Sequence, residues 1–185
     1  MTRARKRPPT VTRAELMPDG SDRQFRTLMH NLLSVMQTQL DNRASLAEML
    51  GLTGIQYTIL TAIAHLTIPE GGVAVVDVAR HLHVTASFVT MEVNKLVQQG
   101  LVDKRPDDTD KRRVQLELTE KAWELIESVV PMQQPVNDAF FDRLSAKDFA
   151  AMCKLMATLA ENSERARAVH MLLKTTFRKR PANPS

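Results

Sequence analysis

The spacing of apolar residues divides the chain into helical stretches and one short β-rich segment. From about residue 21 to residue 50 the apolar side chains recur at intervals of three and four, which is the period of an amphipathic helix that Ser21 or Asp22 can cap. Gly51 ends this helix and Thr53 begins a second one. Gly71 and Gly72 interrupt the pattern, and residues 73–75 can add a short strand. The apolar positions of the two helices are Phe25, Leu28, Met29, Leu32, Leu33, Met36 and Leu40, then Ile55, Ile59, Leu60, Ile63 and Leu66.

Between residues 75 and 119 the pattern predicts two short helices followed by a β-hairpin. The first helix covers about residues 76–82, and the second begins at Thr85 as its N-cap and ends at Gly100, a residue suited to the left-handed turn that closes helices. Two strands, residues 101–105 and 113–118, are joined by a charged loop. This order is typical of a winged helix-turn-helix, whose second helix fits the DNA major groove and whose loop fits the backbone or minor groove. The core side of the second helix is predicted to carry Val89, Val93, Leu96 and Val97.

Beyond Thr119 the pattern is helical again. Thr119 is expected to cap a helix that Pro131 and Pro135 kink or interrupt, because each proline removes a helical hydrogen-bond donor. A last helix is predicted from the cap Ser145. The fold expected from the whole pattern is mainly α with a small β-wing: a winged helix-turn-helix with additional helices at its N- and C-terminal sides.

Charge is distributed unevenly, although the net charge is only +4. Eleven of the 25 basic residues lie within residues 1–13 and 165–185, which contain no acid, so residues 14–164 carry a net charge of −7. Any DNA contact by this central part must therefore be a local patch. One cysteine excludes an internal disulfide and favours the cytoplasm, and no apolar run is long enough for a membrane span.

The expected organisation has five parts. Residues 1–20 form a flexible basic arm, 21–50 a dimerisation helix, 51–120 the DNA-binding domain, 121–175 the C-terminal dimerisation helices, and 176–185 a disordered basic tail. A winged helix of ~70 residues is a complete domain, so the apolar stripes of the end helices are not needed for its core. Exposed apolar stripes normally bind a partner, which favours a two-fold homodimer with two recognition helices.

The segment GLVDKRPDDTDKRRVQLELTEKA resembles the MarR family of transcriptional regulators. The resemblance covers about residues 21–165. It implies a dimer that binds a pseudo-palindromic site, often with a small effector bound between the dimer region and the winged helix. The matching positions are Leu96 and Gly100 at the end of the recognition helix, Arg105 before the wing, Asp110 and Arg112 in the wing, and Leu118 and Thr119 before the next helix.

Four residues depart from the family's pattern. His83 stands at the turn between the two helices, where glycine is frequent, and a positive φ there is tolerable for histidine. Met91 replaces a polar or basic residue, Glu92 replaces an apolar one, and Phe88 is unexpectedly large. The operator sequence therefore cannot be inferred from the family.

The residues expected to contact DNA lie on the recognition helix and the wing. Arg112 can enter a narrow minor groove, Asp110 can position it, and Lys111 and Arg113 suit phosphates. On the helix, hydroxyls and the Asn94 amide can bond phosphates or base edges, and Met91 can contact a thymine methyl. The predicted helix set is Thr85, Ser87, Thr90, Met91, Asn94 and Lys95.

The predicted function is that of a dimeric repressor that a small effector releases from double-stranded DNA. The family resemblance suggests aromatic acids such as hydroxybenzoates or hydroxynicotinates as effectors. Two alternatives remain: a regulator without an effector, and a winged-helix module that binds protein. The effector-binding candidates are Met29, His30, Tyr57, His65 and Trp123.

Other chemistry finds little support in the sequence. No constellation of catalytic residues, phosphate-binding loop or cofactor motif is recognisable, so an enzyme is not expected. Cys153 lies in an apolar helical stripe and is expected to be buried and inert, not a peroxide sensor. His81 and His83 are two residues apart, which is a poor metal-binding spacing on a helix, so no metal site is expected.

Overall fold

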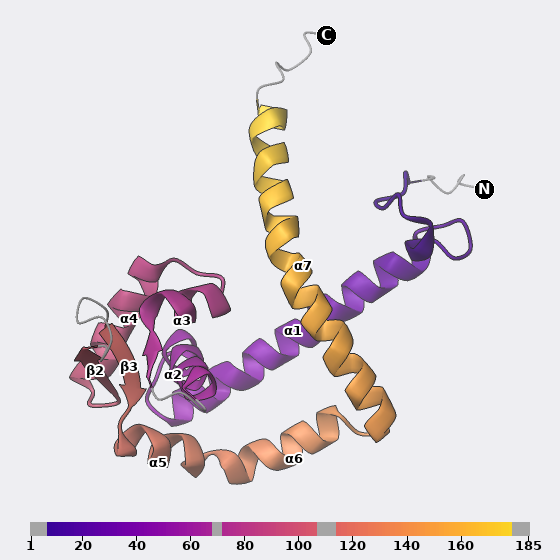
Figure 1. The fold of residues 1–185 in the computed structure, drawn as a ribbon. Helices are drawn as coiled ribbons and strands as arrows, with labels where there is room; N and C mark the ends of the chain where they lie inside the picture. Colours follow the sequence, from indigo (N-terminus) through magenta and orange to yellow (C-terminus); the bar gives the residue numbers. More distant parts are fainter. Residues whose placement is uncertain (1–6, 68–71, 107–113, 179–185) are drawn as a thin grey trace. The chain divides into compact units, whose positions relative to one another are not determined.

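The computed structural model describes residues 7–67, 72–106 and 114–178, and Figure 1 shows its elements. The chain forms two compact units, residues 1–130 and 131–185. The expected fold class, mainly α with a small β-wing, is confirmed. In chain order the elements are η1 (Ala14–Leu16), α1 (Arg23–Met49), α2 (Gly54–Leu66), β1 (Val73–Ala74), α3 (Val75–His81), α4 (Ala86–Gln98), β2 (Val102–Pro106), β3 (Val114–Leu118), α5 (Glu120–Ser128), α6 (Val130–Phe140) and α7 (Ala146–Arg178).

A single carboxylate ties the segment before α1 to the helix. Thr10 donates two hydrogen bonds to Asp22 Oδ2, from its backbone N–H at 2.7 Å and from its hydroxyl at 2.9 Å, and Arg26 Nε donates a third at 2.9 Å. These hydrogen bonds, with that from Arg26 foremost, lower the pKa of Asp22 to about 2. The predicted helix-capping role of Asp22 is wrong, because its carboxylate binds Thr10 and Arg26 and makes no bond to the first N–H groups of α1.

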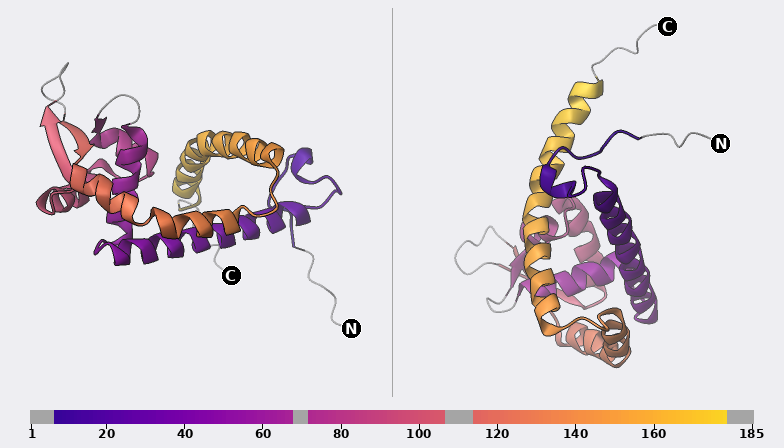
Figure 2. Two further views of the ribbon diagram at one scale, coloured as in Figure 1. Left: turned by 90° about the horizontal axis from the view of Figure 1, so that it is seen from below. Right: turned by 90° about the vertical axis from the view of Figure 1, so that its right-hand side faces the viewer.

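The first two helices begin and end where the sequence predicts. Gly51, with φ +68°, closes α1. Thr53 caps α2 reciprocally: its hydroxyl accepts from the Gln56 N–H at 3.3 Å, and its own N–H donates to Gln56 Oε1 at 3.0 Å. Only the C-terminal part of α1, at Leu46 and Ala47, is buried. The rest of the helix is a long rod that extends away from α2 (Figures 1 and 2).

The winged helix follows the predicted order. The small sheet is antiparallel with strand order β1-β3-β2, and Val102 pairs with Leu118 at one end of the hairpin while Pro106 pairs with Val114 at the other. His83, in the turn between α3 and α4, has φ +54°, as the family's preference for glycine at this point suggested. Gly100 closes α4 with φ +70°.

One apolar core holds this region together. Ile59 and Ile63 of α2, Leu96 of α4 and Leu116 of β3 are completely buried, together with side chains from α3 and α5. The prediction that Val97 belongs to the core is wrong, since 36% of this residue is exposed. The buried face of α4 instead extends to its other edge, where Glu92 is buried.

The C-terminal helices also begin at their predicted caps. The Thr119 hydroxyl accepts from the Ala122 N–H at 3.2 Å, and the Ser145 hydroxyl accepts from the Asp148 N–H at 3.2 Å. The predicted interruption lies at Val129, between α5 and α6, whereas Pro135 lies inside α6 without ending it.

The long helix α7 exposes most of its apolar side chains. Leu155 and Leu172 are 65% and 67% exposed, and Cys153 is exposed as well. The expectation of a buried Cys153 is therefore wrong for the single chain. Other side chains of the same apolar stripe, such as Met156 and Leu159, are exposed with it.

Across residues 7–67, 72–106 and 114–178, no single helix is both long enough and apolar enough to cross a bilayer. Helices α1 and α2 have the length and apolar composition of a membrane span only when they are counted as one segment, and the chain bends by 95° between them.

Candidate nucleic-acid interface

The solvent face of α4 carries all six helix residues that the sequence predicts to contact DNA. Burial of Val89, Val93 and Leu96 against the core sets the rotation of the helix, so the opposite face must point outward. The predicted residues Thr85, Ser87, Thr90, Met91, Asn94 and Lys95 are exposed.

The first turns of α4 combine hydroxyl groups with one apolar side chain. Thr85 Oγ1 accepts from the Phe88 N–H at 3.3 Å and lies 3.2 Å from Ser87 Oγ. The Thr90 hydroxyl donates to the Ala86 carbonyl oxygen at 2.9 Å, so its oxygen is left to accept from outside. Met91 is 48% exposed, which suits contact with an apolar group such as a thymine methyl.

Two lysines beside α4 have different partners. Lys95 Nζ donates to the buried Glu92 carboxylate at 2.7 Å, so a neighbouring negative charge compensates its positive charge. Lys104, on β2, donates to Asn94 Oδ1, which is a neutral acceptor. Within residues 72–106 and 114–178 no carboxylate is seen to pair with Lys104, so among the described groups it adds a positive charge to the face that α4 presents.

The sequence prediction missed Lys104, although a signal for it exists. Alternate residues of a strand share a face, so Lys104 lies on the same face as Val102, which is buried. Its cross-strand partner Leu116 is also buried. Lys104 thus starts on the core side of the sheet, and its long stem carries the ammonium out to Asn94.

The loop of the wing lies outside the described residues, and with it lie the predicted DNA contacts Asp110, Lys111, Arg112 and Arg113. The strands on both sides of that loop are described. Across them Arg105 pairs with Glu117, with 2.9 Å between Nη1 and Oε2. This cross-strand pair stiffens the exposed face of the hairpin at the base of the wing.

Three histidines gather where α2, α3 and the following turn meet. The rings of His65 and His81 lie 5.6 Å apart, centroid to centroid. Partial burial, and then the charges of His65 and His83, lower the pKa of His81. Within the part of the chain that the structure describes, no group of three His, Cys, Asp or Glu side chains is arranged to hold a metal.

The structure separates the predicted effector-binding residues. Tyr57 is buried in α2, whereas His65 is exposed at the end of the same helix and Trp123 is half-buried in α5. Met29 and His30 are exposed on α1, about 20 Å from Arg43 along the helix at 1.5 Å per residue.

Arg43 is a half-buried cation that the sequence prediction missed. Its guanidinium lies over the Tyr57 ring, 5.3 Å from the centroid, and donates a hydrogen bond to the Thr61 hydroxyl. Both partners are neutral, and no carboxylate of the described residues pairs with it. With respect to the described residues, Arg43 is therefore available to an anion as an electrostatic partner.

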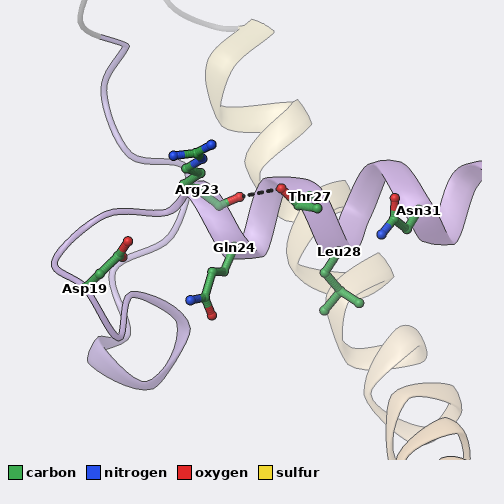
Figure 3. Close-up of a pocket in the computed structure, with 6 residues that line it drawn as sticks. All are labelled: Asp19, Arg23, Gln24, Thr27, Leu28 and Asn31. Carbon is green, nitrogen blue, oxygen red and sulfur yellow. Dashed lines mark hydrogen bonds between the residues drawn. The ribbon is translucent and has the colours of Figure 1, made fainter.

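Two open hollows lie elsewhere on the first unit. One, of about 510 Å³, lies beside α3 and β3 and includes Asp77 and Arg80, which pair at 2.6 Å. The other, of about 480 Å³, lies at the start of α1, where Gln24 and Leu28 project from the same side of the helix (Figure 3). Neither hollow includes a predicted effector-binding residue.

Comparison with known proteins finds a family model that matches part of the chain. Residues 50–113 match the model of the MarR family. The chain is 25% identical over 115 residues to the HTH-type transcriptional repressor NicR of Pseudomonas putida. These aligned residues cover 62% of this chain and 70% of the relative. In general the matched segments span 66–70% of the curated relatives' lengths.

Two solved structures show the same fold. A MarR protein from Peptoclostridium difficile has a TM-score of 0.63 and 21% identity, covering 89% of this chain and 97% of the other. BpsR of Bordetella bronchiseptica, whose DNA binding is regulated by 6-hydroxynicotinic acid, has a TM-score of 0.55 and 22% identity, covering 71% of this chain and 91% of the other. At these identities the likeness shows the fold alone.

Proposed function

Because the chain belongs to the MarR family of winged helix-turn-helix transcriptional regulators, we propose that it binds double-stranded DNA as a homodimer and represses transcription from a pseudo-palindromic operator. The observation that carries the proposal is the solvent face of α4, where hydroxyl, amide and ammonium groups stand on a helix anchored by a rigid core. The relative NicR is a repressor, and no enzymatic function is proposed.

In this function α4 enters the major groove and the wing lies along the neighbouring backbone or minor groove. The cations near α4 and in the wing supply the local positive patch that a body of net charge −7 needs. Arg112 is the proposed minor-groove residue, with Asp110 positioning it and Lys111 and Arg113 on phosphates.

The wing assignment is tested with Arg112→Ala. We expect operator affinity to fall more than tenfold at physiological salt, because the narrow minor groove loses its cation, while the oligomeric state stays unchanged. Lys147→Ala removes the same charge from the first turn of α7 and serves as control, with an expected change below twofold. Equal affinities of Arg112→Ala and the unaltered protein would contradict the assignment.

The homodimer is proposed because both end helices carry apolar side chains that the single chain leaves exposed. They include Leu28, Leu33 and Leu40 on α1 and Leu155, Met156 and Leu159 on α7. A second copy that covers these stripes would remove them from water and would place two α4 helices on one face of a duplex.

We further propose that an aromatic acid releases the repressor. BpsR, which shares the fold, responds to 6-hydroxynicotinic acid. In this chain Arg43 offers a cation for the carboxylate, and Tyr57 and Thr61 hold its guanidinium in place. Ligand bound there would favour a dimer geometry whose α4 helices no longer match the half-site spacing, and release follows by linkage.

The effector is tested by titrating hydroxybenzoates and hydroxynicotinates against the protein–operator complex. We expect one class to lower operator affinity at least tenfold, and to raise stability by ~2.7 kcal/mol at 100 times its dissociation constant. Arg43→Gln should keep operator affinity and lose the response. A response that Arg43→Gln retains would contradict this site, and the absence of any response would favour a regulator without an effector.

A further inference from the structure

The α4–β2 seam, where Lys104 meets Asn94, presents a specific pattern of hydrogen-bond donors. We propose that Lys104 is a positioning residue that holds the Asn94 amide with its nitrogen outward, so that this position of α4 selects guanine over adenine. The inference rests on the proposed DNA-binding function and adds to it the base that one residue reads.

The chemistry of the two groups decides the orientation of the amide. A lysine ammonium has three donors and no acceptor, so only the amide oxygen of Asn94 can face it. The amide nitrogen must then point the other way. Among the described residues no group accepts a hydrogen bond from that nitrogen, and the side chain is exposed on the outer face of α4.

The orientation matters because the purine bases differ in the major groove. Guanine presents two acceptors, N7 and O6, whereas adenine presents the acceptor N7 and the donor N6 amino group. A freely rotating asparagine can match adenine by using its oxygen and its nitrogen together. The Asn94 oxygen accepts from Lys104. An adenine amino group that approached the second lone pair of this oxygen would meet the neighbouring ammonium, donor against donor.

The neighbouring charges strengthen this preference. Lys95, one residue along α4, is paired with the Glu92 carboxylate and is partly neutralised. Lys104 has only the neutral Asn94 as its described partner and keeps its positive charge at the seam. Among the described groups the seam therefore presents hydrogen-bond donors and the positive charge of Lys104, which suits the acceptor-rich edge of guanine.

The experiment begins with selection of bound duplexes from a random pool, followed by affinity measurements on the selected site with each guanine replaced by adenine in turn. For the unaltered protein we expect one position in each half-site at which adenine weakens binding about fivefold or more. Asn94→Ala should lose the preference at that position and at no other.

Lys104→Met should reduce this guanine preference to below about twofold, because the released amide can turn and pair with adenine. Lys104→Arg keeps a donor-only partner for the oxygen and should therefore retain the preference. Lys121→Met is the matched control: it removes an ammonium that donates to the Gln99 carbonyl oxygen at 2.7 Å, and the preference should stay unchanged.

The base preference separates positioning from simple charge attraction. If Lys104→Met weakened guanine and adenine duplexes by the same factor, Lys104 would be a phosphate contact and the inference would be overturned. It would equally be overturned if Asn94→Ala kept the preference. A protein that binds no duplex at all would refute the proposed function itself, and with it this inference.

Discussion

The winged-helix region and the long end helices use apolar side chains in opposite ways. In the first, Ile63, Leu96 and Leu116 are completely buried within a single chain. In α7, Leu155 and Leu172 remain about two-thirds exposed, and much of the apolar stripe of α1 is exposed as well. The same residue types at the same helical spacing are thus buried in a core in one region and exposed to solvent in the other.

The difference shows which part of the molecule can be stable by itself. The region from about Leu46 to Val129 encloses its own core and satisfies its helix ends with caps such as Thr53 and Thr119. The end helices have caps of the same kind, at Ser145 for example, but they lack cover for their apolar faces. Caps define where such helices begin, and in the proposed homodimer a second copy supplies the burial of their apolar faces.

The largest expected effect contrasts a core leucine with an exposed one. Leu96→Ala should lower the free energy of unfolding by ~2–5 kcal/mol, because it leaves a cavity in a closed core. Leu172→Ala should cost much less in dilute protein, since its side chain is largely in water. Chemical denaturation of both variants measures the difference, and equal losses would remove the distinction between the two regions.

The next largest effect concerns dimerisation through the exposed apolar side chains of α7. Leu155→Glu places a charge in the proposed dimer interface, and we expect the dimer dissociation constant to rise at least a hundredfold, equivalent to ~2.7 kcal/mol, since an unpaired charge would be buried. Lys154→Glu introduces a carboxylate at the neighbouring position, outside the stripe, and should change the constant far less. Analytical ultracentrifugation measures both, and a chain that is already monomeric at micromolar concentration would refute the interface.

The smallest expected effect is on the pH dependence of stability, and it concerns His81, a partly buried polar residue of the winged-helix region. Its pKa is lowered in the folded state from the ordinary value of 6.5. Well above pH 6.5 both folded and unfolded chains hold His81 neutral, whereas around and below that pH the unfolded chain binds the proton more readily. Stability should therefore decline as the pH falls from about 7.5 to 5.5. In His81→Gln this decline should be smaller, as measured by denaturation at both pH values.

His65→Gln tests the cause of that shift. It removes one of the two neighbouring charges but leaves the partial burial of the His81 ring, which is the larger cause. The decline in stability should then lie between those of the unaltered protein and His81→Gln. A decline identical in all three proteins would show that His81 does not contribute to the pH dependence.

Local chemistry made much of the fold predictable. Gly51 and Gly100 end their helices because glycine adopts positive φ without strain, and Thr53, Thr119 and Ser145 begin theirs because a hydroxyl can satisfy a free N–H. The recognition helix could be oriented in advance from its apolar spacing. All these features depend on residues only a few positions apart, so the sequence by itself determined them.

Tertiary structure decided what depends on distant neighbours. Asp22 binds Thr10 instead of capping its helix, and Glu92 is buried at the edge of α4 where Val97 is partly exposed. Arg43 lies over Tyr57, and no acid of the described residues pairs with it. Lys104 meets Asn94 because the hairpin returns to the side of α4. Apolar spacing specifies which face of an element will be buried, but only the packed chain determines which polar groups meet across it, since those contacts join residues that the sequence leaves far apart.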